Sequence, residues 1–236
     1  MFNVIRKTEY WDALDNPAVF RKLGGFTLKA LDGLKHIQDA WTLNRVHHVK
    51  NARVLEIGGG LSRVLPAMDE SNERWNLDEF LGAGNGVLEA PDMPGIRLLR
   101  KTMGSFAQEL EDAYFDLAFS ISVIEHIPHK ALDDFWRDHA RILAPGGLAV
   151  HTIDLYLGDE PDSGVAGRLK FYKEMPARYG LVPVDVPAIG ERIAFECDMA
   201  SNSDWGMWRW NKNVPALRDT RAACQSVSLG MVLRKA

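Results

Sequence analysis

The segment Val54–Arg63, with the sequence VLEIGGGLSR, limits the possible folds of this chain more than any other stretch. A short apolar run leads to the acid Glu56, and three glycines follow at 58–60. Glycine adopts backbone conformations that other residues avoid, and its missing side chain lets a ligand lie against the main chain. We therefore expect a buried strand, then a ligand-binding turn, then a helix.

Four more short apolar segments follow this strand, and stretches with helical spacing lie around them. The clearest helix is predicted at 129–143, where apolar residues share one face until Pro145 and two glycines end it. Such alternation is typical of a parallel sheet with helices on both faces. The predicted strands are 54–57, 74–77, 96–101, 115–120 and 148–153, with further candidates at 192–198 and 226–235.

The chain is predicted to form a single domain over 1–236, because no stretch of it has the composition of a linker. Its 236 residues are 46% hydrophobic, which is enough for a sizeable core. Residues 1–50 show helical spacing and are expected to form a helical cap. Residues 51–236 are expected to form a Rossmann-like α/β core.

Charge and cysteine content argue against several kinds of partner. The net charge is -4, and no strongly basic run is present. We therefore expect that the chain binds neither nucleic acid nor a membrane. No apolar stretch is long enough to span a bilayer, and the first residues lack a signal-peptide core. Cys197 and Cys224 lack the spacing of a metal site or redox pair. These features predict a cytoplasmic protein without a metal.

The glycine turn is compatible with two ligand classes, dinucleotides and S-adenosylmethionine. The dinucleotide pattern G-x-G-x-x-G, started at Gly58, requires a third glycine at position 63, and Arg63 stands there. The preceding acid, Glu56, would also repel a pyrophosphate, whereas it would attract an ammonium or a sulfonium. The residues therefore favour the second ligand.

At this point the chain resembles the class I S-adenosylmethionine-dependent methyltransferases. Glu56-Ile-Gly58-Gly59-Gly60 is similar to the family's first motif, and Asp78 lies where its second acid follows the next strand. The stretches FDLAFSISVIEHIP, ILAPGGLAV and SLGMVLRK resemble later segments in the family's order, across roughly 50–236. The resemblance implies a doubly wound, seven-stranded sheet, mostly parallel, with an antiparallel last strand.

The resemblance also implies a set of cofactor-binding residues. Asp78 would bind the ribose hydroxyls. The alternative role for Asp78 is the N-cap of a helix. If the predicted strand is shifted by one residue, Glu79 would bind the ribose instead. The family's adenine-binding acid is missing here, and we expect Ser105 and Phe106 to serve there. The predicted cofactor-binding residues are Glu56, Gly58, Gly59, Gly60, Asp78, Ser105, Phe106, Ser120 and Ile121.

Two histidines are candidates for a general base. His151 and Asp154 come at the end of the fifth predicted strand, at the sheet edge where ligands bind, and they are either a base with its orienting acid or a bonded pair that holds a loop. His126 is the second candidate, with a buried structural role as the alternative. Three tryptophans at 205, 208 and 210 either line the pocket or pack on the N-terminal helices.

The sequence therefore predicts an S-adenosylmethionine-dependent methyltransferase that acts on an oxygen or nitrogen of a small molecule, such as a sugar or a natural-product intermediate. Methyl transfer to a protein substrate and cofactor binding without turnover are the alternatives, because fold resemblance does not fix function. A dinucleotide-dependent oxidoreductase is a third reading, and Arg63 argues against it. The acceptor atom and the oligomeric state stay open.

Overall fold

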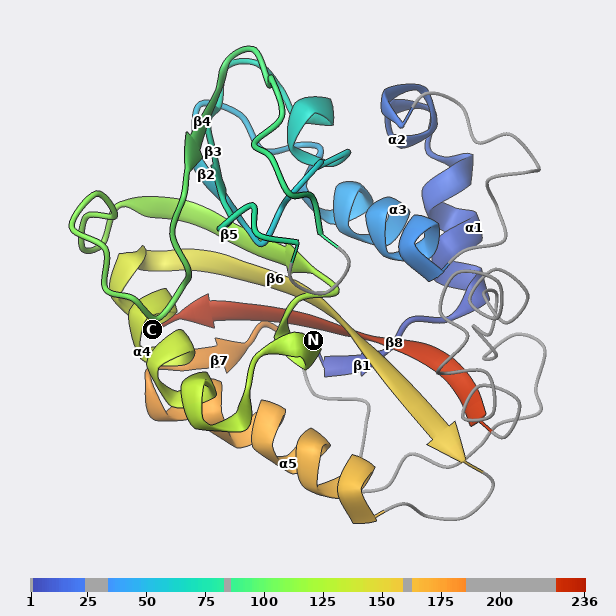
Figure 1. Cartoon of the computed structure of the whole chain (residues 1–236). Coiled ribbons are helices and arrows are strands. Elements are labelled where there is room, and N and C mark those ends of the chain that lie inside the picture. The colour runs from blue at the N-terminus through green and yellow to red at the C-terminus, as the bar shows by residue number, and fades with distance from the viewer. Residues whose placement is uncertain (1, 24–33, 83–85, 159–162, 186–223) are drawn as a thin grey trace.

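A mixed β-sheet runs through the centre of the molecule (Figure 1). The computed structural model describes residues 2–23, 34–82, 86–158, 163–185 and 224–236. The sheet has the order β1-β8-β6-β5-β2-β3-β4, with β7 also paired to β8. The strands are β1 (Phe2–Val4), β2 (Arg53–Ile57), β3 (Glu73–Leu77), β4 (Ile96–Leu99), β5 (Phe115–Ile121), β6 (Leu143–Gly158), β7 (Leu181–Pro183) and β8 (Cys224–Lys235).

The four middle pairs of the sheet, from β4 through β3, β2 and β5 to β6, are parallel. Strand β8 runs antiparallel to β6, β1 and β7. Strands of a parallel sheet are covered on both faces, which explains why β2 and β5 are almost continuously apolar. The predicted fold class, a mostly parallel Rossmann-like sheet with an antiparallel last strand, is confirmed.

The sheet differs from the prediction in its strand count, because it has eight strands rather than seven among the described residues. The extra strand is β1, which lies inside the stretch predicted to be a helical cap. It pairs with β8 in the register Phe2 to Met231. Strand β7 was also not predicted as a strand, and the predicted strand at 192–198 lies outside the described residues.

Helices cover the two faces of the sheet in separate groups (Figure 1). The N-terminal helices pack on one face, where Trp41 and Tyr10 lie in the core. The C-terminal helices pack on the other face, where Trp136 and Tyr172 lie in the core. The helices are α1 (Lys7–Asp15), α2 (Pro17–Lys22), α3 (Leu34–Val46), α4 (Leu132–Ile142) and α5 (Ser163–Arg178).

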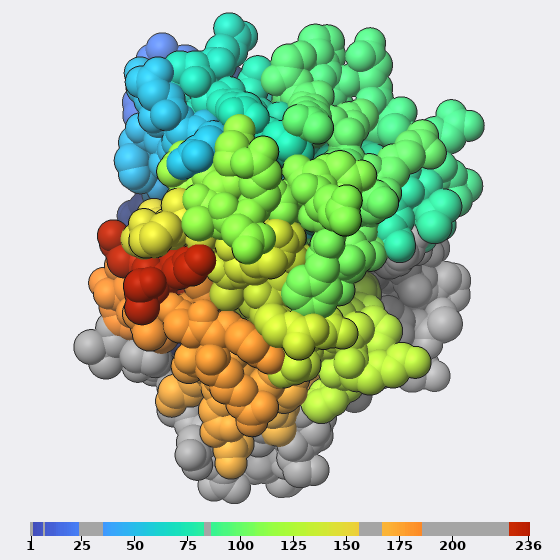
Figure 2. Space-filling view, turned by 90° about the vertical axis from the view of Figure 1, so that its left-hand side faces the viewer, coloured from blue at the N-terminus to red at the C-terminus, as the bar shows by residue number. Residues whose placement is uncertain are grey.

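Helix α4 has the apolar face that its sequence predicted. Leu132, Phe135, Trp136 and Ile142 are buried, at the three- and four-residue spacing of a helix that packs by one face. Its end at Ile142 comes before the proline and two glycines, which lie within the first part of β6. In the space-filling view of Figure 2, α4 and the orange α5 lie side by side on one face of the molecule.

The connections between β2 and β5 are mainly loops. In their described parts there is no α-helix, and the glycine turn leads only to the short 3₁₀-helix η2 (Leu65–Ala67). The expected helix after the glycines is therefore wrong. Pro66 lies inside η2 and lacks the N–H that a continuing α-helix needs. No helix in the described part of the chain is long and apolar enough to cross a membrane.

Candidate cofactor and active site

The glycine turn follows β2 directly and is held against its neighbours. Gly58 has φ +65° and Gly60 has φ +47°, both in the region that favours glycine. The N–H of Gly58 donates to the carbonyl oxygen of Leu77 at 2.7 Å, which ties the turn to the end of β3. A Cβ on Gly58 would lie 2.6 Å from Cγ2 of Val123, so this position has no room for a side chain.

Glu56 points into the protein beside this turn. Its side chain is buried, with 3% of the residue exposed, and its Oε2 has no hydrogen-bond partner among the described residues. Burial raises the pKa of this carboxyl to about 8, although Ser62, Lys35 and Arg63 favour its charged form. A buried carboxylate oxygen without a partner is costly, and a cationic ligand removes that cost.

Asp78 follows β3 and binds the glycine turn. Its Oδ2 accepts a hydrogen bond from the N–H of Gly60 at 2.9 Å, and its Oδ1 accepts one from the N–H of Phe80 at 2.7 Å. Asp78 is half-buried, whereas the neighbouring Glu79 is exposed. Since β3 ends at Leu77, the strand is not shifted by a residue, and Asp78 rather than Glu79 faces the turn.

Lys35 of α3 lies at the same edge of the sheet. Its Nζ donates to the carbonyl oxygen of Ile121 at 2.8 Å, and its charge acts on both Glu56 and Asp154. Ser120, the other predicted contact on β5, is fully buried and shares a hydrogen bond of 2.8 Å with Nδ1 of His151. The structure therefore places Ile121 at the edge and Ser120 inside the sheet.

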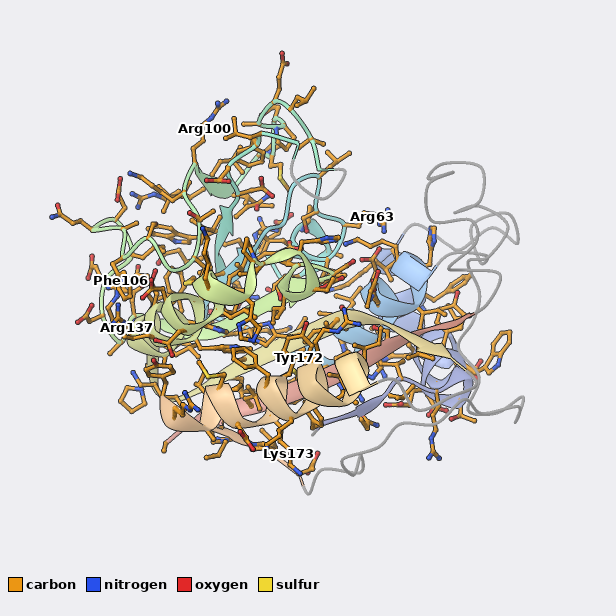
Figure 3. The ribbon with its side chains drawn as sticks, turned by 60° about the horizontal axis from the view of Figure 1, so that its bottom comes forward. Arg63, Arg100, Phe106, Arg137, Tyr172 and Lys173 are labelled. Atoms are coloured by element: carbon orange, nitrogen blue, oxygen red, sulfur yellow. The ribbon has the colours of Figure 1, made fainter. Side chains whose placement is uncertain are left out.

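Ser105 and Phe106 lie in the loop between β4 and β5, against α4. The N–H of Phe106 donates to Oδ2 of Asp138 at 3.0 Å, and the guanidinium of Arg137 lies 4.6 Å from the Phe106 ring. In Figure 3, the labels of Phe106 and Arg137 lie next to each other and away from that of Arg63. The side-chain and main-chain contacts found for Ser105 and Phe106 in the described residues are with Thr102, Asp138 and Arg137 and not with the other predicted cofactor residues.

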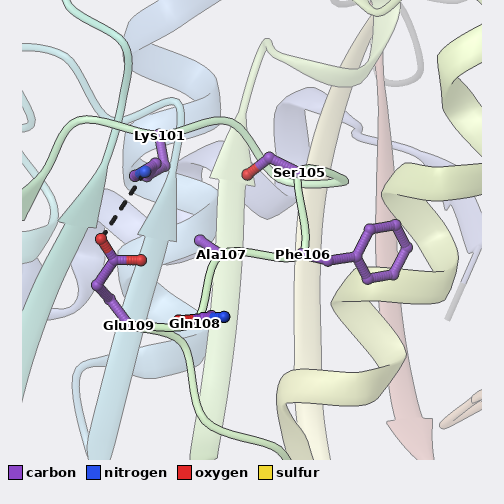
Figure 4. Close-up of a pocket in the computed structure, with 6 residues that line it drawn as sticks. All are labelled: Lys101, Ser105, Phe106, Ala107, Gln108 and Glu109. Carbon is purple, nitrogen blue, oxygen red and sulfur yellow. Dashed lines mark ion pairs between the residues drawn. The ribbon is translucent and has the colours of Figure 1, made fainter.

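The same loop borders a surface hollow of about 590 Å³ (Figure 4). Lys101 and Glu109 form an ion pair of 3.8 Å across it, and Ser105 donates to the carbonyl oxygen of Thr102. The hollow is lined by Lys101, Ser105, Phe106, Ala107, Gln108 and Glu109, all from one loop. The residues that line it do not include the glycine turn or Asp78.

Comparison with known proteins bears on this arrangement. Residues 81–151 match a family model described as a methyltransferase domain. This match supports the resemblance of the chain to the S-adenosylmethionine-dependent methyltransferases. The family resemblance, enzyme class and cofactor expected from the sequence are confirmed, and no curated protein matches the chain.

Solved structures of methyltransferases share the fold at low identity. Phosphoethanolamine N-methyltransferase 2 of Haemonchus contortus, in complex with S-adenosyl-L-methionine, has a TM-score of 0.57 and 15% identity, over 96% of this chain and 60% of that one. Geranyl diphosphate C-methyltransferase of Streptomyces coelicolor A3(2) has a TM-score of 0.55 and 12% identity, over 95% and 89%. At these identities the likeness shows the fold.

His151, the first candidate for the base of the methyltransferase, lies in the core rather than in the crevice. It is fully buried, with its ring 5.4 Å from that of Trp136 and 4.9 Å from that of His139, under α4. Burial, with a smaller effect of His139, holds its pKa well below the usual value. Side chains alternate between the two faces of a strand, and the side chain of His151 points to the face that α4 covers. A base must reach its substrate, so the burial of His151 does not support it as the general base.

His126, the second candidate, is exposed on the 3₁₀-helix η4 (Ile124–His126). Its neighbour Glu125 has the more unusual surroundings, because one of its carboxylate oxygens is buried without a partner. Glu125 also contacts Ser122 and the main chain of Asp154. Sequence reasoning noted Glu125 only as part of a motif and did not assign it a role, because the partner acid is 29 residues away in β6.

Proposed function

We propose that this methyltransferase transfers a methyl group from S-adenosylmethionine to an oxygen or nitrogen atom of a small molecule. The observation that carries the cofactor site is the unpartnered Oε2 of Glu56 beside the glycine turn. When bound, S-adenosylmethionine supplies a methyl group on a positively charged sulfur. The residues of this chain align the reactants and exclude water, which is the main task in such a displacement.

The residues at the edge of β2 and β3 fit this cofactor. Glu56 would bind the ammonium group, because it has a buried oxygen free to accept a hydrogen bond from a cation. The main chain at 58–60 would lie against the cofactor, since the two glycines with positive φ leave no side chain in the way. Asp78 would accept hydrogen bonds from the ribose hydroxyls, because each of its carboxylate oxygens keeps a second lone pair.

A small-molecule substrate is supported by what the chain offers beyond its core. The described residues add three helices and a short strand before β2, and none of them carries a basic surface run. Two of the similar structures are named for methyl transfer to small molecules, phosphoethanolamine and geranyl diphosphate. The three tryptophans at 205, 208 and 210, which the sequence analysis placed either at the pocket or against the N-terminal helices, lie outside the described residues.

The test is a calorimetric titration of the protein with S-adenosylmethionine, S-adenosylhomocysteine and NAD. We expect the two sulfur ligands to bind at micromolar concentration and NAD not to bind. Replacement of Glu56 by glutamine keeps the size of the side chain and removes its charge, so this variant should bind the sulfur ligands at least tenfold more weakly. Absence of binding to the wild-type chain would refute the proposal.

A further inference from the structure

Two carboxyl side chains meet at the carboxyl edge of β5 and β6, next to the proposed cofactor site. Glu125 follows β5 on η4, and Asp154 belongs to β6. The hydroxyl of Ser122 lies 2.7 Å from Oε1 of Glu125 and 3.2 Å from Oδ2 of Asp154. The main-chain N–H of Asp154 also donates to Oε1 of Glu125 at 3.2 Å. The two acids therefore form one hydrogen-bonded unit.

The hydroxyl between the acids indicates how many protons this unit holds. A serine hydroxyl has a single proton, so Ser122 donates to only one carboxyl at a time. When it donates to Glu125, its contact with Asp154 is a hydrogen bond only if Asp154 carries a proton and donates it. The amide of Gln38 donates to Oδ1 of Asp154 at 2.5 Å and to Ser228 at 2.9 Å, which holds Asp154 in place.

The charges around the pair agree with this count. Burial and the charge of Asp154 raise the pKa of Glu125 to about 8, and burial also raises the pKa of Asp154. Two close carboxylates cannot both ionise easily, so the pair keeps one proton and one negative charge near neutral pH. Oε1 of Glu125 accepts hydrogen bonds from both the Ser122 hydroxyl and the Asp154 N–H, and these two contacts favour the charge on Glu125, whereas burial favours its protonated form.

The charge on Glu125 has no counterpart in the described part of the chain. Its Oε2 is buried and has no hydrogen-bond partner there, and none of the ion pairs found there includes it. Buried carboxylates in proteins are paired or they are costly. Ser122 itself has φ +56°, an unfavourable conformation for a residue with a side chain, and such strain is retained where the surroundings enforce it.

We propose that Glu125 and Asp154 form the acceptor site of this enzyme, and that the acceptor is a small amine that binds as its ammonium ion to Oε2 of Glu125. This inference rests on the proposed function. The edge then has two unpartnered carboxylate oxygens for two cations, Glu56 for the ammonium of the cofactor and Glu125 for that of the acceptor. An alcohol would leave the charge of Glu125 unpaired.

The pair also accounts for the proton that has to leave the nitrogen. Glu125 accepts one proton from the ammonium ion, and the nitrogen regains its lone pair. That lone pair forms the new bond to the methyl carbon, while the bond from carbon to sulfur breaks and its electron pair stays on sulfur. The methylated nitrogen is positively charged, and the proton on Glu125 passes to solvent after the product leaves. Asp154 is a positioning residue, because it contacts Glu125 and Ser122.

The experiment uses S-adenosylmethionine with a ¹³C-labelled methyl group and the small-molecule filtrate of a yeast extract. Carbon–proton NMR spectra of the products distinguish methyl groups on nitrogen from those on oxygen. The variants are Glu125→Gln, Asp154→Asn and, as a matched control, Glu111→Gln, which changes an exposed acid in the loop before β5. Calorimetric titration with S-adenosylhomocysteine checks that each variant is folded and binds cofactor.

We expect labelled N-methyl products from the wild type and from Glu111→Gln, and a loss of at least about a hundredfold in Glu125→Gln with cofactor binding retained. The groups that face Glu125 are Ser122, Asp154 and Tyr172, while Lys35 and His126 act on Asp154. Asp154→Asn leaves Glu125 as the one titrating carboxyl of the pair, so the pH profile of its rate should show a single carboxyl titration where that of the wild type shows the two steps of a coupled pair.

Three results would overturn the inference and leave the proposed cofactor site intact. They are O-methyl products, unchanged N-methylation by Glu125→Gln, and no labelled product although the wild type binds cofactor. Failure of the wild type to bind S-adenosylhomocysteine would instead overturn the proposed function itself.

Discussion

The carboxylate of Asp78 accepts a hydrogen bond from the main-chain N–H of Gly60 at 2.9 Å. This bond joins the acid after β3 to the glycine turn after β2, so the two motifs that suggested a cofactor in the sequence form one structural unit. Parallel neighbouring strands end at the same edge of a sheet, and the register pairs Ile57 with Leu77, the last residues of β2 and β3. Disturbing either motif should therefore affect the other.

Replacement of Asp78 by alanine should weaken the binding of S-adenosylmethionine at least tenfold and lower the free energy of unfolding by about 1 kcal/mol, because two main-chain N–H groups lose their acceptor. Calorimetry and urea unfolding measure the two effects. Glu79→Ala is the matched control, since Glu79 is the exposed neighbour. Equal losses in both variants would show that Asp78 has no special role.

Replacement of Gly58 by alanine should destabilise the protein by about 1–3 kcal/mol and abolish measurable cofactor binding. The new Cβ would lie 2.6 Å from Val123, and the residue has φ +65°, so both space and backbone conformation oppose the change. Combination with Val123→Ala should restore only part of the stability, because the backbone penalty remains. Full recovery in the double variant would mean that the clash alone mattered.

The Glu56→Gln variant should become more stable than the wild type, by a margin that grows as the pH rises. The pKa of Glu56 is raised to about 8 by burial, whereas an unfolded glutamate has a pKa near about 4.3. The folded wild type therefore loses stability between these values, by at most about 1.4 kcal/mol per pH unit, and the glutamine variant does not. Urea unfolding at pH 5, 6, 7 and 8 measures the difference. A pH-independent difference would contradict a buried titrating Glu56.

Replacement of His139 by leucine should remove an acid-sensitive element. Burial lowers the pKa of His139 to about 3, and the ring is fully buried, so folding requires the neutral form. An unfolded histidine binds its proton near about pH 6.5, so the wild type should lose about 2 kcal/mol relative to the variant between pH 7 and pH 5. Unfolding curves at the two pH values test this. His48→Gln, at an exposed position, should show no such difference.

Local sequence was sufficient for most of the sheet. The strands at 53–57, 73–77 and 115–121 lie within one residue of their predicted positions, because each is an apolar run bounded by polar residues or glycine. The carboxyl-edge placement of Glu56, the glycines and Asp78 was also predictable, since the order of parallel strands brings their ends together.

Other features depended on contacts that no local pattern contains. Strand β1 forms only because β8, more than two hundred residues later, offers it a free edge. Ser105 and Phe106 were expected at the adenine position, but their loop is held against α4 by Asp138, a residue over thirty positions away.

The sequence by itself determined the order of the strands along the chain, the glycine turn and the two acids of the proposed cofactor site, because these depend on residue type and short spacing. Tertiary structure alone decided which polar side chains face a ligand. Alternation along β6 sends His151 under α4 and Asp154 to the opposite face, where it meets Glu125 through Ser122. Which face of a strand is sealed and which meets a neighbouring acid depends on how the layers pack around it.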